Sequence, residues 1–184
     1  LNKDGSYDNY GESWLIRYDI DPTTGALPWK DYKRMGKNAD KSRLNVYNNK
    51  IAVSFMSGKQ VPGGGQTGDI YVADFSSSGT DAEPVRRPAN VQCEIRDLKV
   101  LPNGTAYVLT YDQDAGYHHI TPHIYQTTIS NLMSDHPEAW TEITTPEERS
   151  GSMGKIDVEY YTKRFWTNFG TDIEVYTDGG TRAG

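Results

Sequence analysis

The sequence lacks several features that would assign it to a common class of protein. It has one cysteine, Cys93, which excludes an internal disulfide framework and a metal site built from cysteines. No stretch approaches the roughly 20 consecutive apolar residues of a membrane-spanning helix. A positive net charge is also missing, since 19 basic and 25 acidic residues give −6 at pH 7. This disfavours a protein that holds nucleic acid or anionic membranes through a general positive field.

Aliphatic residues are scarce as well. Leu, Ile, Val and Phe together make up 33 of the 184 residues, a level that indicates disorder in a highly charged chain. Here the net charge per residue is low, and 13 Tyr and 4 Trp add apolar surface, so we expect a folded chain. The many polar residues and the acidic pI near 5.2 favour an extracellular or cell-surface location.

The local pattern predicts β-strands throughout the chain. Residues 14–20 alternate, with Trp14, Ile16, Tyr18 and Ile20 on one face. Further runs rich in β-branched and aromatic residues lie at 51–55, 70–75, 106–111 and 173–176. Turns rich in Gly, Pro, Asn and Asp separate these runs. The only helix-like stretch is short, at 131–134.

An internal repeat of about 50 residues organises the predicted strands. One set of similar segments recurs at offsets of 55, 54 and 49 residues, at 15–20, 70–75, 124–129 and 173–176. A second set comes before a tight turn and another β-rich run, at 44–46, 98–100 and 157–160. Each repeat therefore predicts a strand, a tight hairpin, a strand, a variable loop and a strand, followed by a polar fourth segment.

A repeat of this length with four antiparallel strands resembles the blade of a β-propeller. The resemblance covers nearly the whole chain, which we interpret as one all-β domain with blade-like repeats at about 1–38 (partial), 39–90, 91–149 and 150–184 (partial). It is a likeness of architecture, because no Trp-Asp dipeptide or Kelch double glycine stands at the expected place and no Asp-box is intact. A β-sandwich of hairpins is the alternative fold.

The number of predicted strands bears on whether such a ring could close. Thirteen strands are fewer than the four blades of four strands in the smallest propellers. We therefore expect a segment of a larger propeller, which a second chain or further residues would complete; a four-bladed ring with an irregular closing blade is the alternative. The chain begins at Leu1 rather than Met and ends at 181–184 without a visible terminal element, which favours the first interpretation.

Long segments join the second and third strands of the repeats, at 3–12, 57–68 and 112–123. The hairpin turns at the other junction have only two or three residues. In propellers the long junctions open on the face that usually binds ligands, so the resemblance implies a binding face there, although exposed loops also tolerate insertions. Aromatic rings stack on sugars, and the side chains that we first expect to contact a ligand are Tyr7, Tyr10, Trp14, Tyr117 and His118.

The third long segment is rich in histidine. The side chains that could bind Zn, Cu or Ni are His118, His119, His123, Asp112 and Asp114. No helix aligns them, and the adjacent His118 and His119 would point in opposite directions in an extended chain. Hydrogen bonding and stacking by a surface loop is the favoured interpretation, and no other cofactor is expected.

Three charged residues occupy equivalent positions in the repeats: Arg43, Asp97 and Asp157, each one residue before an apolar residue of an innermost strand. In a propeller such positions can face the central channel, where two carboxylates could carry out acid–base hydrolysis. A structural charge network between repeats is the favoured alternative, because no general-base partner is identifiable.

These observations favour a non-catalytic extracellular or cell-surface module that binds a glycan, a small ligand or a protein through the long loops on one face. One alternative is a polysaccharide-active hydrolase or lyase in which Asp97 and Asp157 act as acid and base. The other is a structural component of an extracellular assembly.

Overall fold

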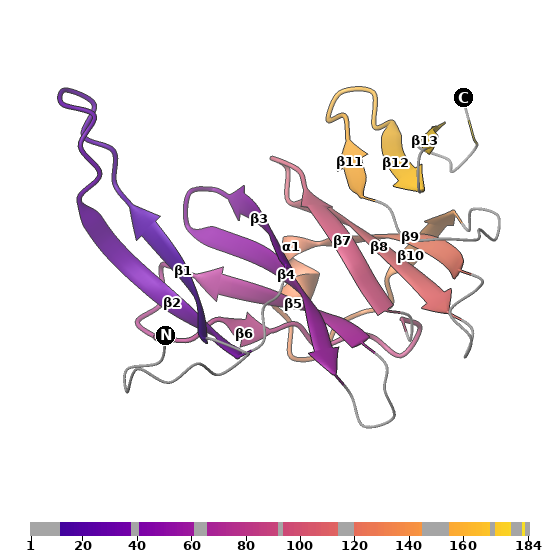
Figure 1. Cartoon of the computed structure of the whole chain (residues 1–184), viewed down its shortest axis with the longest axis horizontal. Helices are drawn as coiled ribbons and strands as arrows, with labels where there is room; N and C mark the ends of the chain where they lie inside the picture. The colour runs from indigo at the N-terminus through magenta and orange to yellow at the C-terminus, as the bar shows by residue number, and fades with distance from the viewer. Residues whose placement is uncertain are drawn as a thin grey trace.

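The computed structural model describes residues 12–37, 41–60, 66–91, 94–113, 120–144, 155–169, 172–177 and 182. In this part of the chain, thirteen strands and one short helix are present, and the strands form four antiparallel sheets in sequence order (Figure 1). The prediction of an all-β chain is confirmed. No helix among the described residues is long and apolar enough to cross a membrane.

Every sheet is a meander in which each strand pairs with the next one in the sequence. The first sheet holds β1 (Glu12–Tyr18) and β2 (Trp29–Lys37). The second holds β3 (Lys41–Tyr47), β4 (Ile51–Gln60), β5 (Gln66–Asp74) and β6 (Glu83–Pro84). The third holds β7 (Glu94–Val100), β8 (Thr105–Gln113), β9 (Ile120–Thr128) and β10 (Thr141–Thr144), with α1 (Ile129–Leu132) after β9. The fourth holds β11 (Ile156–Val158), β12 (Phe165–Phe169) and β13 (Asp172–Tyr176).

Tight turns join the first and second strands of the second, third and fourth sheets. Between β3 and β4, Asn48 and Asn49 both have positive φ angles, of 50° and 55°, which is the backbone of a two-residue hairpin turn and is tolerated best by Asn and Gly. Between β7 and β8, Gly104 has a φ of 85°, and the Asn103 side chain accepts a hydrogen bond from the Thr105 N–H at 3.0 Å. These turns set the register of the paired strands.

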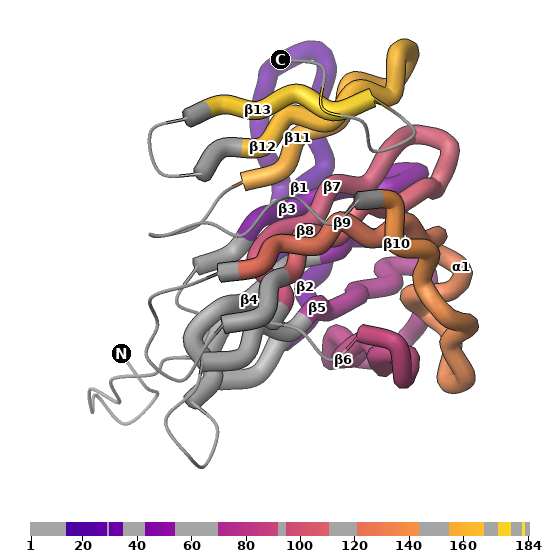
Figure 2. Tube along the Cα trace, turned by 90° about the vertical axis from the view of Figure 1, so that its right-hand side faces the viewer, coloured from indigo at the N-terminus to yellow at the C-terminus, as the bar shows by residue number. Residues whose placement is uncertain are grey.

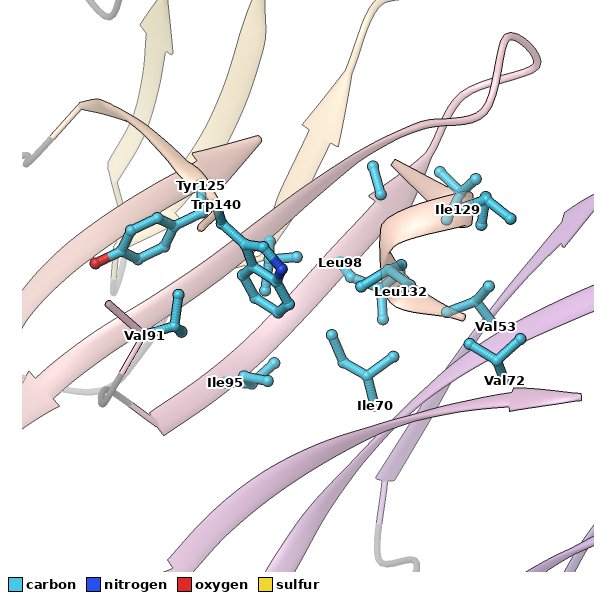
Figure 3. Packing of buried hydrophobic residues seen from close by; sticks show 13 residues of the cluster. Val53, Ile70, Val72, Val91, Ile95, Leu98, Tyr125, Ile129, Leu132 and Trp140 are labelled. Atoms are coloured by element: carbon cyan, nitrogen blue, oxygen red, sulfur yellow. The ribbon is translucent and has the colours of Figure 1, made fainter. Parts of the chain in front are cut away.

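Apolar side chains between successive sheets form the core. Figure 2 follows the backbone in a second view, in which the strands of the fourth sheet lie side by side next to β7 and β8. Between the second and third sheets, Leu98 of β7 packs with Val53, Val72 and Leu132 (Figure 3). Between the third and fourth sheets, the cluster includes Tyr107, Leu109, Ile124, Ile156, Val158 and Phe165. Each sheet therefore buries one face against its neighbour. The first and fourth sheets lie at opposite ends of the row (Figure 1), so the described sheets form an open series.

The contact between the first and second sheets is built differently. Its buried apolar residues are small, since Ala52, Ala73 and Ala82 form the cluster, and the partly buried Leu15, Tyr71 and Phe75 pack against it. Lys33 of β2 is 1% exposed, and its ammonium group donates hydrogen bonds to the carbonyl oxygens of Ser77, at 2.9 Å, and of Gly79. These bonds tie the first sheet to the turn that follows β5.

Candidate functional site

The first residues of β3 and β7 lie at the end of their sheets where the long loops were predicted to begin. In the second sheet Lys41 pairs with Ser57, near the end of β4, and β4 pairs with β5 out to Gln60. The third sheet repeats this pattern, because Glu94 pairs with Tyr111 and the pairing of β8 with β9 continues to the end of β8. Arg43 on β3 and Asp97 on β7 therefore lie toward the end of the sheets where β4 leads to β5 and β8 leads to β9. The prediction that 57–68 and 112–123 are loops is wrong in part, because residues 57–60 and 66–68 belong to β4 and β5, and residues 112–113 and 120–123 belong to β8 and β9.

Asp97 joins the first strands of three successive sheets. Its side chain is fully buried, and its Oδ2 atom accepts hydrogen bonds from the Arg43 guanidinium on β3 and from the Ile156 N–H on β11, the latter at 3.0 Å. Arg43 donates a further bond to the Ile156 carbonyl oxygen. A buried carboxylate is tolerated when a cation and hydrogen-bond donors surround it. The hydrogen bonds of Asp97 and Arg43 therefore hold β3, β7 and β11 together.

A β-bulge places Asp97 on the side that faces β11. Ile95 and Leu98 are three residues apart, and in a regular strand they would lie on opposite faces. Both nevertheless pack in the same core cluster, because the pairing of β7 with β8 shifts between Ile95 and Asp97. The extra residue restores the alternation, so that Leu98 faces the second sheet while Asp97 faces the fourth.

Asp157 is the exposed member of the charged group. Its side chain is 61% exposed, and its Oδ1 atom lies 2.9 Å from Lys99 Nζ and 3.9 Å from Arg43 Nη2. The Val158 N–H donates to the same oxygen at 2.9 Å. Partial burial acts to raise the pKa of Asp157, but the hydrogen bonds from Lys99 and Val158 and the charges of Lys99 and Arg43 outweigh it. The pKa of Asp157 therefore lies below its ordinary value.

A pocket of about 590 Å³ opens beside this group, and Trp166 forms part of its wall. Trp166 on β12 lies directly opposite Asp157 on β11 in the antiparallel pair, and its side chain is 45% exposed. The lining is completed by charged, polar and aliphatic residues: Arg43, Lys155, Ile156, Asp157, Thr167 and Ile173. The pocket thus combines an indole ring with charged hydrogen-bonding groups.

Trp14, the one described residue among those predicted to bind a ligand by stacking, does not line this pocket. Trp14 lies on β1, at the far end of the row of sheets, where its ring meets that of Tyr32 edge-on at 5.0 Å between centroids. The predicted residues Tyr7, Tyr10, Tyr117 and His118 lie outside the described residues. Nothing in the structure therefore tests them as members of one binding face.

His123 is held by a carboxylate from the neighbouring strand. Its Nδ1 atom lies 2.7 Å from Glu142 Oε1, and its ring stacks on Tyr125 at 6.2 Å between centroids. His119 and Asp114 lie outside the described residues, and for Asp112 only the backbone, in β8, is described. Within the described ranges, no three His, Cys, Asp or Glu side chains gather in a way that could hold a metal ion.

Sequence reasoning missed Lys99 and Trp166, although each leaves a signal. Lys99 comes two residues after Asp97, and such residues share a face of a regular strand. A two-residue hairpin turn at 162–163 would place Asp157 opposite residue 168 and diagonal to Trp166 on the same face of the sheet, which is still within reach of an aromatic side chain. The bulge in β7 and the choice of rotamers leave no such signal.

Comparison of the chain with models of known protein families, with curated proteins and with solved structures finds no match in any of the three. The geometry of the pocket formed by Arg43, Asp157 and Trp166 is therefore the basis for inferring a function.

Proposed function

We propose that the chain is a non-catalytic carbohydrate-binding module built as part of a β-propeller. Four sequential antiparallel meanders that pack face to face, with the first strands of three of them joined through Asp97, support the propeller interpretation. The proposal includes an extracellular or cell-surface location, for which the support is the composition alone.

The observation that carries the proposal is the cross-strand pair of Trp166 and Asp157 in one pocket. A sugar ring presents an apolar face, which an exposed indole can cover, and hydroxyl groups, which carboxylates and guanidinium groups can bind. Arg43 and Asp157 supply these groups at the pocket wall.

The two carboxylates are poorly suited to acid–base hydrolysis of a polysaccharide. A glycosidase needs one carboxyl group with a raised pKa to protonate the leaving oxygen. Asp157 has a lowered pKa, and Asp97 is fully buried and bonded to Arg43, out of reach of a substrate. Binding without catalysis therefore accounts better for this arrangement than the hydrolase or lyase does.

A glycan array followed by titration calorimetry tests the proposal. We expect Trp166→Ala to weaken binding of the best glycan by about tenfold, which is the value of one aromatic contact. Tyr161→Ala is the matched control, because Tyr161 is an aromatic residue in the turn between β11 and β12 that is 90% exposed and outside the pocket. Equal affinity of the Trp166→Ala variant and the wild type would refute the pocket as the binding site.

Variants of the long loop separate the two places where a glycan could bind. Tyr117→Ala and His118→Ala should weaken binding with little loss of stability if the loop extends the site. Weaker binding by these variants together with unchanged binding by Trp166→Ala would move the site to the loop. Release of reducing ends from the bound polysaccharide, abolished by Asp157→Asn, would instead favour the hydrolase.

A further inference from the structure

The first strands of three sheets carry the same apolar pair, in which two aliphatic residues flank a polar one. The pairs are Leu44 and Val46 on β3, Leu98 and Val100 on β7, and Ile156 and Val158 on β11. The second and third pairs are at most 8% exposed, whereas Leu44 is 56% and Val46 is 60% exposed. The same structural position is therefore covered twice and left uncovered once.

The second and third strands of the preceding sheet cover the two buried pairs. Leu98 and Val100 share a cluster with Val53 of β4 and Val72 of β5. Ile156 and Val158 share a cluster with residues of β8 and β9: Tyr107, Leu109 and Ile124. The sheet that precedes β3 has only two strands among the described residues, β1 and β2. In the described part of that sheet, no second strand covers Leu44 and Val46.

In a comparison of the first sheet with the four-stranded sheets, β1 corresponds to their third strand. Leu15 of β1 packs against the cluster of Ala52, Ala73 and Ala82, just as a third strand packs against the following sheet. β2 pairs with one edge of β1, and in the described part of the chain no strand pairs with the other edge. As far as the described residues go, the backbone donors and acceptors on this edge have no strand partner, and an added strand could bind to them.

A groove lies between the free edge of β1 and the uncovered face of β3. Its volume is about 460 Å³, and Leu44, Val46, Ile16 and Tyr18 are among the residues that line it. Ile16 and Tyr18 are each about half exposed. The groove thus joins an apolar floor to an open sheet edge, and a β-strand with alternating apolar side chains would fit both.

We propose that this groove binds an antiparallel β-hairpin supplied from outside these 184 residues, which completes the first sheet to four strands. The second strand of the hairpin pairs with the free edge of β1, and its apolar side chains cover Leu44 and Val46. The first strand runs alongside β3, as β3 itself runs alongside β7.

The contact between β3 and β7 defines the chemistry of that first strand. The Asn45 side chain donates to the Leu98 carbonyl oxygen at 3.3 Å and accepts from the Val100 N–H at 3.0 Å. The equivalent backbone groups on β3 belong to Leu44 and Val46. A hairpin with an amide side chain at the matching position would bind these groups in the same way. The partner is therefore a hairpin similar to residues 41–60 of this chain.

A backbone-cyclised peptide with the sequence of residues 41–60 serves as the probe, since cyclisation lowers the entropy lost on binding. On addition of this peptide to the full chain, we expect amide hydrogen exchange at residues 14–18 and 44–46 to slow by at least tenfold. The same peptide with Asn45→Ala should bind about five- to tenfold more weakly, which corresponds to the loss of one or two hydrogen bonds.

Variants of the protein show whether the groove is the binding site. Leu44→Lys places a charge on the floor of the groove and should abolish the protection by the probe. Met133→Lys is the matched control, because Met133 is an exposed apolar residue at the end of α1 that lines neither the groove nor the carbohydrate pocket. Circular dichroism before each titration checks that both variants fold, and Val46→Thr offers a milder change if Leu44→Lys does not fold.

Three outcomes would overturn the proposal. The first is no protection of residues 14–18 at a millimolar concentration of probe. The second is protection that persists in a folded Leu44→Lys or Val46→Thr variant. The third is protection without probe that grows with protein concentration as sedimentation shows a dimer, because this would assign the groove to a second copy of the chain. None of these outcomes bears on the proposed carbohydrate pocket.

Discussion

The side-chain oxygen of Asn45 on β3 accepts a hydrogen bond from the backbone N–H of Val100 on β7 at 3.0 Å. The amide nitrogen of Asn45 donates to the Leu98 carbonyl oxygen at 3.3 Å. Asn45 is 9% exposed, so both bonds lie out of water. The Asn45 side chain thus hydrogen-bonds to the backbone of β7 as a neighbouring strand would. In this way it joins the second sheet to the third.

Replacement of Asn45 by Ala should lower the free energy of unfolding by about 1–3 kcal/mol. The substitution leaves two backbone groups of β7 without their protein partner in a buried position. Urea unfolding followed by circular dichroism measures the change. Ser130→Ala is a suitable control, because Ser130 is exposed on α1, and it should differ from the wild type by less than about 0.5 kcal/mol. A similar loss in both variants would contradict this role for Asn45.

Arg43→Met should be the more damaging of two substitutions in the charged group. It leaves the buried carboxylate of Asp97 without its cation, which costs about 3–5 kcal/mol. Lys99→Met removes an ion pair with the exposed Asp157 and should cost less than about 1 kcal/mol. Adding Asp97→Asn to Arg43→Met should restore part of the stability, because the unpaired charge is gone. Denaturant midpoints of the single and double variants measure this recovery. Its absence would count against an electrostatic cause.

Stability should fall as the protein is acidified. Four aspartates have a pKa below the ordinary value of 3.8: Asp19, Asp21, Asp74 and Asp157. At Asp74 the main cause is the hydrogen bond from the Ser76 hydroxyl, followed by that from the Ser76 N–H. Because the folded state binds these protons less tightly than the unfolded state, their stabilisation is present above about pH 5 and is lost as the pH falls through 3.8 toward the lowered values.

Urea midpoints between pH 7 and pH 3 measure this effect. The double variant with Asp74→Asn and Asp157→Asn should show a smaller decline of the midpoint with acidification than the wild type. A wild-type midpoint that rises toward pH 3 would contradict the direction of these pKa shifts.

Substitutions at three glycines distinguish the energetic cost of backbone strain from that of steric overlap. Gly104 has a φ of 85°, and an added Cβ atom would lie 3.1 Å from the Tyr47 hydroxyl oxygen. Gly25 has a φ of 70° with open space around it, and Gly79 has neither a positive φ nor an atom within 3.8 Å. We expect Gly79→Ala to be nearly neutral, Gly25→Ala to cost about 1 kcal/mol, and Gly104→Ala to cost about 2–3 kcal/mol in thermal or urea unfolding. Equal costs at Gly25 and Gly104 would show that Tyr47 moves aside freely.

Much of the local structure could be predicted from the sequence. The runs predicted at 14–20, 51–55 and 70–75 lie in strands except for 19–20 and Phe75, which follow the ends of β1 and β5, because period-two patterns follow directly from the geometry of a strand. The short helix-like stretch at 131–134 overlaps α1, which the structure begins at Ile129. Tight turns at 48–49 and 102–104 also match, since Asn and Gly tolerate positive φ angles.

The sequence predicted a charge network between repeats, but the individual contacts between sheets were beyond such reasoning. The equivalence of Arg43 and Asp97 in the repeat was visible, but their direct bond depends on a bulge that changes which face Asp97 occupies. Buried Lys33 had no signal either, because its partners are carbonyl oxygens, which every residue has. The pocket at Trp166 required the register of β11 and β12 and their position beside β3. Pairing along a strand follows from local pattern, whereas contacts between sheets depend on their packing.

The meander order of the sheets has a consequence for the sequence of events in folding. Pairing between neighbouring strands closes only short loops, so any one sheet can begin to form with a small loss of chain entropy. The bonds of Asp97 join residues that are 54 and 59 positions apart, so they must wait until two or three sheets have assembled. We therefore expect Arg43 and Asp97 to act late, slowing the unfolding of the assembled protein more than they speed its folding.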